Sequence, residues 1–392
     1  MKKIQLTCAH AIVKYLISQK ILVDGKKLPL FAGAFGIFGH GNVACLGQAL
    51  EENKKELPTW RGHHEQNMAL TGIAFSRAKR RKQIFVATSS VGPGSTNMLT
   101  AAAVAMSNRL PMLFLPGDTY ANRMPDPVLQ QVEHFNNPNI TQNDAFKYVT
   151  RYFDRITRPE QILQTFPQAI QTMIDPADCG PACISLSQDV QGETFDYPEE
   201  FFNEKIHTIR RPRPDDYQIK QAADLIKKSK NPIIISGGGI FYSDAMKELS
   251  QFAKKHNIPT AQTVMGYSTM KKDDPYFLGA IGGFGGKAPN DFMKKTDLAI
   301  AIGTKLADFT TGSWTNFENP NFKLVSINVS RFDANKHMAQ SIVGDAKVCI
   351  QDLTVALGSW KASDEWYKKS RSAVKSWNNY LCLLYTSDAA DE

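Results

Sequence analysis

The sequence predicts an α/β protein with two parallel-sheet domains. Short apolar runs alternate with helical patterns along most of the 392 residues. A strand, a helix and a second strand at this spacing predict a parallel sheet covered by helices. A block rich in proline and charge divides the series into two sets. Each set is long enough to bury a core of its own.

The first domain is expected over residues 1–195. Its buried strands are predicted at 83–88, 111–115 and 182–186, where apolar runs have the length of a strand. A helix is predicted between the first two strands. Its inner face is formed by four residues at helical spacing, Met98, Ala101, Ala102 and Ala105.

Residues 196–216 are expected to form a linker, because their prolines fix an extended backbone and cannot continue a helix. The second domain is expected over 217–358. Strands are predicted at 232–235, 297–302 and 323–328. Its first helix carries apolar residues on one face, namely Ile219, Ala222, Ala223 and Ile226.

The bulk composition excludes several classes of protein. Hydrophobic residues make up 42% and charged residues 21% of the chain, and no apolar stretch reaches the roughly 18 residues of a membrane span. The segment after Met1 lacks an uninterrupted apolar core, so a cytoplasmic protein without a membrane partner is expected. The six cysteines lack the paired spacing of a zinc site, and no metal site is predicted.

The net charge of +8 does not by itself indicate nucleic-acid binding. The densest basic run, residues 77–82, ends a predicted helix, where cations complement the helix dipole. No aromatic-rich nucleic-acid motif accompanies it, so no nucleic-acid partner is expected.

The first candidate site residue is Glu65, which stands where a loop becomes a helix in the segment 61–69. Unpaired backbone N–H groups and the helix dipole stabilise a carboxylate in a first helical turn. Taken alone, the position fits a surface capping glutamate at least as well as a catalytic one.

The second candidate is the turn Gly92-Pro93-Gly94, which follows a predicted strand and opens a helix. Glycines at such a turn allow the backbone to approach a ligand, and the helix start offers N–H donors. A simple tight turn explains the same residues equally well.

Two glycine runs in the second domain, 237–239 and 282–286, form the third candidate. Neither has the spacing of a dinucleotide fingerprint with an acidic residue about 20 positions later. Structural turns are favoured, and a non-catalytic nucleotide-binding module remains an alternative.

In combination these motifs are more specific. The segments 63–66, 92–97 and 108–111 together resemble the pyrimidine-binding domain of the acetolactate synthase-like family of thiamine diphosphate enzymes. The segments 180–190, 237–239, 263–266 and 303–308 extend the resemblance into the family's central, Rossmann-like domain, so that it covers about residues 1–375. Asn67 and Lys305 depart from the family pattern.

Further segments resemble one group within the family, hydrolases that open the ring of a cyclic 1,2-diketone. These segments are 38–43, 125–131, 158–161, 188–193, 308–311 and 327–332. A small cyclic diketone is therefore the substrate that the resemblance implies. An acetolactate synthase-like lyase or ligase is the alternative within the family.

The resemblance implies a role for each motif residue. Glu65 would be catalytic and would bind the aminopyrimidine ring of thiamine diphosphate. The other cofactor-binding residues would be Gly92, Pro93, Gly94, Asn97, Gly39 and His40. The family also forms homodimers or tetramers, which places the helix from Glu65 to about Lys79, with small residues Ala69, Gly72 and Ala78, at a subunit contact.

The family binds Mg²⁺ and the diphosphate in a third domain through a Gly-Asp-Gly motif followed by Asn. Gly117-Asp118-Thr119 and Gly344-Asp345-Ala346 do not match it. The third domain is therefore expected to be missing, with 359–381 starting the connection to it. Residues 382–392 resemble one reading frame of a transposase sequencing adapter and are left out of the fold prediction. The 392 residues alone are expected to be inactive.

Overall fold

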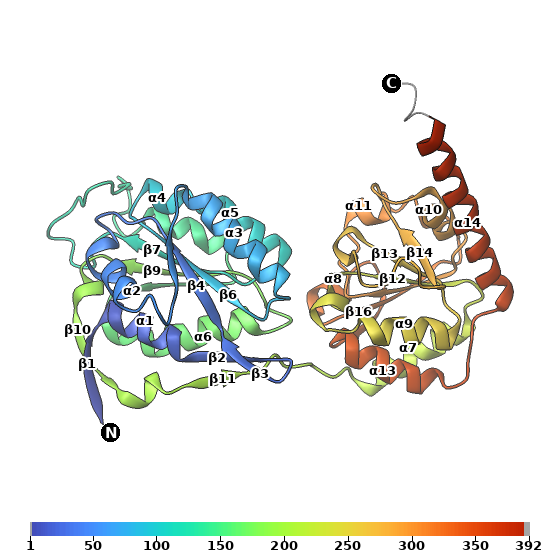
Figure 1. Cartoon of the computed structure of the whole chain (residues 1–392), viewed down its shortest axis with the longest axis horizontal. Helices are drawn as coiled ribbons and strands as arrows, with labels where there is room; N and C mark the ends of the chain where they lie inside the picture. Colours follow the sequence, from blue (N-terminus) through green and yellow to red (C-terminus); the bar gives the residue numbers. More distant parts are fainter. Residues whose placement is uncertain (1, 388–392) are drawn as a thin grey trace. The chain divides into compact units, whose positions relative to one another are not determined.

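The computed structural model describes residues 2–387 and consists of two compact units that meet at Arg210 and Arg211. In Figure 1 each unit is an α/β structure with helices on both faces of a sheet. Each main sheet has six strands, and every pair of neighbouring strands is parallel. The predicted α/β fold with two parallel sheets is therefore confirmed.

The main sheet of the N-terminal unit has the strand order β5-β4-β6-β7-β9-β8. The three strands predicted from apolar runs correspond to β6, β7 and β9, whose side chains are all buried. The strands are β4 (Phe31–Gly36), β5 (Thr59–Arg61), β6 (Ile84–Ser89), β7 (Leu113–Asp118), β8 (Tyr152–Ile156) and β9 (Ala182–Ser187).

Helices cover both faces of this sheet. One face packs against α1 (Cys8–Ser18) and α6 (Ile162–Ile174), and the other packs against α3 (Glu65–Ala78) and α5 (Leu99–Asn108) (Figure 1). The predicted inner face of α5 is confirmed, since its three alanines are fully buried. The short helices are η1 (Val43–Gly47), α2 (Gln48–Glu52), α4 (Pro93–Thr96), η2 (Gln142–Tyr148), η3 (Pro159–Gln161), η4 (Val190–Gly192) and η5 (Glu199–Phe202).

Much of the segment expected to be a linker, 196–216, is folded onto the N-terminal unit. Tyr197 is fully buried, and Phe201 stacks on Tyr15 of α1 with ring centroids 4.3 Å apart. Burying such aromatic side chains holds the segment on the unit, and Pro198 keeps its extended backbone as the last residue of a strand. Two small sheets result, one from β1 (Lys3–Thr7) and β10 (Thr194–Pro198), the other from β2 (Gln19–Val23), β3 (Lys26–Pro29) and β11 (Lys205–His207).

Two adjacent arginines mark the junction of the units. Arg210 Nε pairs with Asp175 Oδ2 of the N-terminal unit at 2.5 Å. Arg211 pairs with Asp345 at 3.1 Å and with Asp244 at 3.3 Å, both in the C-terminal unit. Each arginine is therefore anchored to a different unit.

The C-terminal unit has the strand order β14-β13-β12-β15-β16-β17. One face packs against α7 (Asp216–Lys228), α9 (Met246–His256) and α13 (Ala346–Leu357), and the other packs against α10 (Lys287–Met293) and α14 (Asp364–Ser387). The strands are β12 (Pro232–Ser236), β13 (Thr260–Gln262), β14 (Phe277–Ala280), β15 (Leu298–Ile302), β16 (Lys323–Asn328) and β17 (Gln340–Val343). The remaining helices are α8 (Gly238–Tyr242), η6 (Val264–Gly266), α11 (Asp308–Thr311) and α12 (Arg331–Ala334).

Helix α14 begins inside the C-terminal unit. The indole of Trp366 stacks on Phe292 of α10 at 4.0 Å, and its Nε1 donates a hydrogen bond to the carbonyl of Pro232 at 2.8 Å. The helix continues to Ser387 and so includes the first residues of the segment 382–392; the rest of that segment lies outside the described residues.

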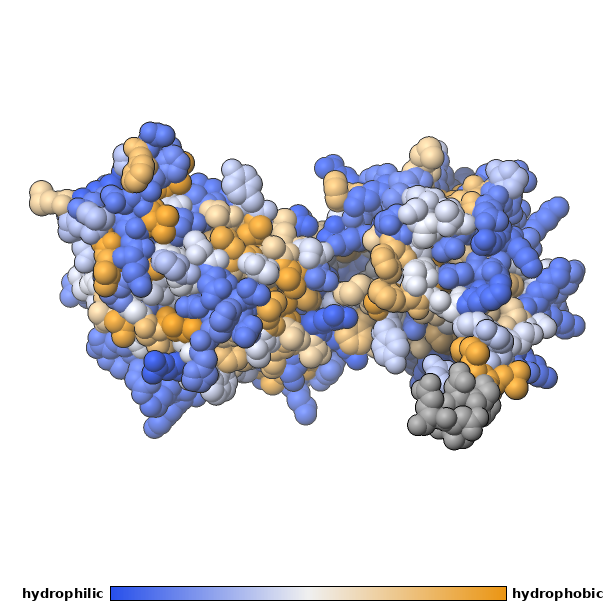
Figure 2. Space-filling view, turned by 90° about the horizontal axis from the view of Figure 1, so that it is seen from above, coloured by the Kyte–Doolittle hydropathy of each residue, from blue (hydrophilic) through white to orange (hydrophobic). Residues whose placement is uncertain are grey.

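Apolar side chains also lie on the surface of both units, as Figure 2 shows on one side of the molecule. Between residues 2 and 387, no helix combines the length and apolar character needed to cross a membrane. Within residues 2–387, five cysteines form no disulfide bond: Cys8, Cys45, Cys179, Cys183 and Cys349.

Candidate functional site

The candidate site lies at the carboxyl edge of the N-terminal sheet. The chain passes from β4 to β5 on one side and then to β6 on the other side of β4. The loops that follow β4 and β6 therefore diverge, and ligands of open parallel sheets bind where strand order reverses in this way. The seven residues proposed from the sequence follow β4, β5 or β6.

Glu65 is the first residue of α3 and is half-buried. His64 precedes it as the N-cap, and its Nδ1 accepts a hydrogen bond from the backbone N–H of Asn67 at 3.4 Å. The side-chain amide of Asn97 donates to Glu65 Oε2 at 2.8 Å. Asn97 caps the C-terminus of α4, so the structure brings together two of the proposed site residues from different loops.

The Gly92-Pro93-Gly94 turn lies beside this pair. Gly92 has a φ of +73°, and a Cβ there would lie 2.0 Å from the carbonyl oxygen of Gln130. Glycine is required at this position on both counts. Pro93 is the first residue of α4, and a Cβ on Gly94 would lie 3.4 Å from Glu65 Oε1. The turn therefore lies directly against the second carboxylate oxygen of Glu65.

The loop after β4 contributes Gly39 and His40. A Cβ on Gly39 would lie 2.7 Å from Ser90 Oγ, so this loop packs against the start of the turn that follows β6. His40 Nε2 is buried, and within residues 2–387 it has no hydrogen-bond partner.

Other loops at the same edge also hold buried polar atoms without a partner among the described residues. These atoms are Nε2 and Oε1 of Gln142, Oε1 of Gln188 and Oε1 of Gln191. Buried polar groups in folded proteins are almost always hydrogen-bonded, so such a set at one edge indicates a place for a polar ligand.

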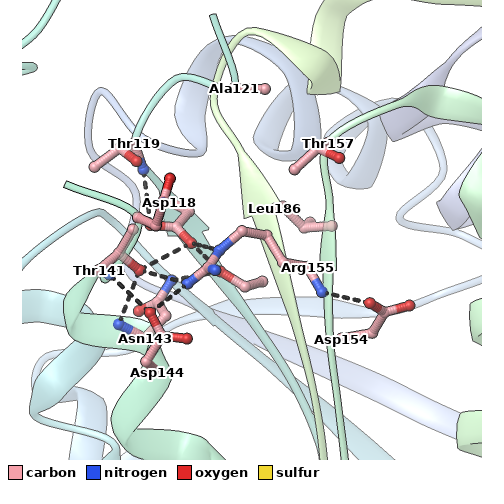
Figure 3. Close-up of polar contacts among 12 residues, drawn as sticks. Asp118, Thr119, Ala121, Thr141, Asn143, Asp144, Asp154, Arg155, Thr157 and Leu186 are labelled. Carbon is pink, nitrogen blue, oxygen red and sulfur yellow. Dashed lines mark hydrogen bonds and ion pairs between the residues drawn. The ribbon is translucent and has the colours of Figure 1, made fainter. Parts of the chain in front are cut away.

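A buried ionic network lies at the same edge and was not recognised in the sequence. Asp118 ends β7 and is fully buried. Its Oδ2 accepts hydrogen bonds from Arg155 Nε at 2.8 Å, Ser185 Oγ at 2.5 Å and Thr141 Oγ1 at 3.1 Å. Figure 3 shows the guanidinium of Arg155 directed at Asp118, Thr141 and Asp144.

Asp144 is the second carboxylate of this network. Burial alone would raise the pKa of Asp144, but hydrogen bonds from Lys147, the Thr141 backbone and Arg155 outweigh it and leave the pKa lowered. Arg155 is affected in the opposite sense. Burial lowers the pKa of Arg155, but pairing with Asp118 and Asp144 leaves the pKa raised, so the Arg155 guanidinium is held charged.

Comparison with known proteins decides the family. The N-terminal TPP binding domain of thiamine pyrophosphate enzymes matches residues 31–137, and the central domain of these enzymes matches residues 219–353. The chain belongs to the thiamine pyrophosphate enzymes. The first match contains all seven of the proposed site residues, and the second contains the whole sheet of the C-terminal unit.

Several curated thiamine pyrophosphate enzymes are similar over nearly the whole chain, and each is named 3D-(3,5/4)-trihydroxycyclohexane-1,2-dione hydrolase. The protein of Clostridium tetani is 44% identical over 392 residues, which is 100% of this chain and 61% of that protein. The Clostridium perfringens strain 13 protein is 46% identical over 380 residues, covering 97% and 60% of the two chains. The chain thus spans about 60% of the length of these relatives.

The site fits the pyrimidine end of thiamine diphosphate. It offers a carboxylate at a helix start, a glycine turn against that carboxylate, and a buried imidazole nitrogen at His40 that has no hydrogen-bond partner among the described residues. In the part of the chain that the structure describes, no group of three or more His, Cys, Asp or Glu side chains is arranged to hold a metal ion.

The glycine run 237–239 of this thiamine pyrophosphate enzyme has a packing role. A Cβ on Gly237 would lie 2.5 Å from the carbonyl oxygen of Gly303, and a Cβ on Gly239 would lie 2.5 Å from the Cα of Gly303. The run allows the loops after β12 and β15 to touch through their backbones. The favoured interpretation as a structural turn agrees with this packing.

Two of the small residues on α3 do not face outward as the sequence suggested. Ala69 is fully buried, and a Cβ on Gly72 would meet Phe85 and Met112 at 2.9 Å. These residues let α3 pack closely on its own sheet, whereas Ala78 is exposed. A bulky substitution at Ala69 would therefore disturb the core of the unit and would not test a subunit contact.

Proposed function

We propose that this chain supplies the pyrimidine-binding part of a thiamine diphosphate-dependent hydrolase that opens 3D-trihydroxycyclohexane-1,2-dione to 5-deoxyglucuronate in myo-inositol degradation. The observation that carries the proposal is the Glu65 carboxylate at the start of α3, fixed by Asn97 against the Gly92-Pro93-Gly94 turn. Identity of 44–46% to relatives of that name, over nearly the whole chain, supports the choice of substrate.

Glu65 would hold a proton at the ring nitrogen of the aminopyrimidine. The side-chain amide of Asn97 is hydrogen-bonded to Glu65 Oε2, so Glu65 Oε1, beside Gly94, would be the oxygen that faces the cofactor. A carboxyl group in this position acts as a general acid–base only if bulk water is kept away from it. Thiamine diphosphate, when bound, supplies the carbon nucleophile and the electron sink for breaking a carbon–carbon bond beside a carbonyl.

Gly92, Pro93 and Gly94 would place their backbone against the cofactor, and His40 Nε2 would find its missing partner in a polar group of the ligand. The second carbonyl of the dione withdraws electrons and so favours cleavage of the bond between the two carbonyl carbons. The overall reaction adds one water across that bond, so that one carbonyl carbon becomes a carboxylate and the other becomes an aldehyde of the opened chain.

Mg²⁺ and the diphosphate are proposed to bind a third domain, as the family pattern implies. The proposed assembly is a homodimer or tetramer, and the proposed location is the cytoplasm. Light scattering of the purified protein at several concentrations tests the assembly, because a mass that stays at one chain throughout contradicts it.

Dione hydrolysis tests the proposed function. The 392 residues are joined to the remaining C-terminal part of the Clostridium tetani relative, which gives the joined enzyme. It is expected to hydrolyse the dione with thiamine diphosphate and Mg²⁺. Glu65→Gln should lower the rate roughly 100- to 10,000-fold. The exposed carboxylate Glu56 provides the matched control, and Glu56→Gln should leave the rate unchanged.

The joined enzyme is also assayed with pyruvate, to test the acetolactate synthase-like alternative. A joined enzyme that converts pyruvate and leaves the dione intact would identify an acetolactate synthase-like enzyme. A folded joined enzyme in which Glu65→Gln turns over as fast as the unchanged protein would contradict the role of Glu65.

A further inference from the structure

Residues 119–140 form a long loop between β7 and η2 that lies against the candidate site. The loop exposes large apolar side chains, among them Met124 (90% exposed) and Phe135 (96%). The backbone carbonyl of Gln130 is packed onto Gly92, so the loop touches the turn that adjoins Glu65. Because these large apolar side chains are exposed, their burial contributes little to the position of the loop at that turn.

Carboxylates hold both ends of the loop. At the first end, Asp189 accepts hydrogen bonds from the backbone N–H groups of Ala121 at 2.9 Å and Asn122 at 3.0 Å. At the second end, Asp144 accepts from the backbone N–H of Thr141 at 2.7 Å. Charge-assisted hydrogen bonds of this kind are stronger than neutral ones.

Arg155 joins the two ends. Its Nε donates to Asp118, the residue from which the loop departs, and its Nη2 donates to Thr141 and Asp144, where the loop returns (Figure 3). Thr141 Oγ1 in turn donates to Asp118. One guanidinium thus closes the base of the loop.

The same network reaches the Glu65 pair through buried hydrogen bonds. Ser185 Oγ donates to Asp118 and accepts from Asn143 Nδ2 at 2.7 Å. The side chain of Asn143 also bonds to Ser95 Oγ. Ser95 lies in α4, the short helix whose C-cap is Asn97, and Asn97 holds Glu65.

We infer that Arg155 is a positioning residue that, through Asp118, holds loop 119–140 against the Gly92 turn and holds α4 in register with Glu65. The inference rests on the proposed function for its catalytic consequence, but its structural claim stands on the network alone. Without the guanidinium, two carboxylates remain close together with little solvent, and uncompensated buried charge is strongly unfavourable. The base of the loop is then expected to open.

Hydrogen exchange of the 392-residue chain tests the inference directly. Arg155→Met is expected to accelerate exchange of the backbone N–H groups of Ala121, Asn122 and Thr141 roughly 10- to 100-fold, the effect of losing hydrogen bonds to a charged group. The amides of Thr96, the last residue of α4, and of Asn97, its C-cap, should accelerate as well. Amides of α6, which lies outside the network, should keep their rates.

Two matched variants separate positioning from general stability. Arg210→Met removes another arginine–carboxylate pair of the same unit and should leave the loop amides unchanged. Arg155→Lys keeps the charge but not the fork of donors, so it should restore only part of the protection. Thr141→Val breaks the network more mildly and serves if Arg155→Met does not fold.

Two outcomes would overturn the inference: loop amides that exchange at the original rate in the variants, or equal acceleration throughout the N-terminal unit. Failure of the joined enzyme to hydrolyse the dione would leave these exchange rates unaffected, so the two proposals fail separately. In an active joined enzyme, Arg155→Lys should raise the KM for the dione by a larger factor than it lowers kcat, because the loop borders the site.

Discussion

The side-chain amide of Asn97 donates a hydrogen bond to the Glu65 carboxylate at 2.8 Å, although 32 positions separate the two residues. The contact exists because the loops after β5 and β6 meet at the reversal of strand order. It fixes one oxygen of the carboxylate and leaves the other beside Gly94.

Replacing Asn97 by alanine should reduce kcat/KM of the joined enzyme for the dione roughly 10- to 100-fold, since a hydrogen bond to a charged group contributes about 1.5–3 kcal/mol. Asn203→Ala, at an exposed asparagine of the same unit, is the control. Equal rates for the two variants would show that Glu65 does not depend on Asn97.

Thiamine diphosphate with Mg²⁺ should bind the 392-residue polypeptide no more tightly than about millimolar, or about −4 kcal/mol. Two phosphates need Mg²⁺ and its oxygen ligands, and residues 2–387 present no such group of carboxylates. Isothermal titration measures this affinity. A micromolar dissociation constant would show that the pyrimidine contacts suffice or that a diphosphate site has been overlooked.

Stability of the N-terminal unit should fall as the pH is lowered from about 6.5 to about 4. His207 is 5% exposed and its Nε2 bonds to Gln19 Oε1 at 2.9 Å. Burial, with a smaller effect of Lys205, lowers the pKa of His207 to about 4 from 6.5. The unfolded chain therefore binds more protons than the folded chain in this pH window. The contribution of His207 to the free energy of unfolding is fully present above about pH 6.5 and declines below it, by up to about 3 kcal/mol.

Urea unfolding at pH 7 and pH 5 measures this decline, and His207→Gln should remove most of the difference. The comparison with the variant is needed because burial also lowers the pKa of His256 in the other unit. If the variant lost stability between the two pH values as steeply as the parent chain, His207 would not be the group responsible.

Trp366→Ala should destabilise the C-terminal unit by about 3–5 kcal/mol, because it removes a large buried side chain and leaves a cavity. The indole is 3% exposed, stacks on Phe292 and donates to the carbonyl of Pro232. Tyr380→Ala, at a half-exposed aromatic of the same helix, should cost much less. Thermal unfolding of the two variants tests whether the start of α14 is part of the core of the C-terminal unit.

Local sequence patterns were sufficient for the six predicted strands, which correspond to β6, β7, β9, β12, β15 and β16, and for the place of Glu65 at a helix start. The inner face of α7 follows from Ile219, Ala222, Ala223 and Ile226, because residues at that spacing share one side of a helix whatever the rest of the fold does. All four are buried. The Gly92 turn was visible for the same reason, since a strand end followed by glycine and proline is a local signal.

Arg155 could not be found in this way. Its partner Asp118 is 37 positions away, and the two meet only because β8 lies outside β9 at the edge of the sheet, an order that no local pattern reveals. In the segment 196–216, by contrast, the local composition indicated a linker. Its prolines and charges obscured Tyr197 and Phe201, whose packing on the unit depends on distant side chains such as Tyr15.

The two arginines at the junction have a practical consequence. Arg210 is paired with Asp175, and Arg211 is paired with Asp244 and Asp345. If the chain is divided at the peptide bond between Arg210 and Arg211, each arginine therefore stays in the same half as the carboxylates it pairs with. That bond is therefore a natural crossover for recombining halves from different relatives. A hybrid spliced there inherits every hydrogen bond of the Arg155 network from one parent and the whole sheet of the other unit from the second.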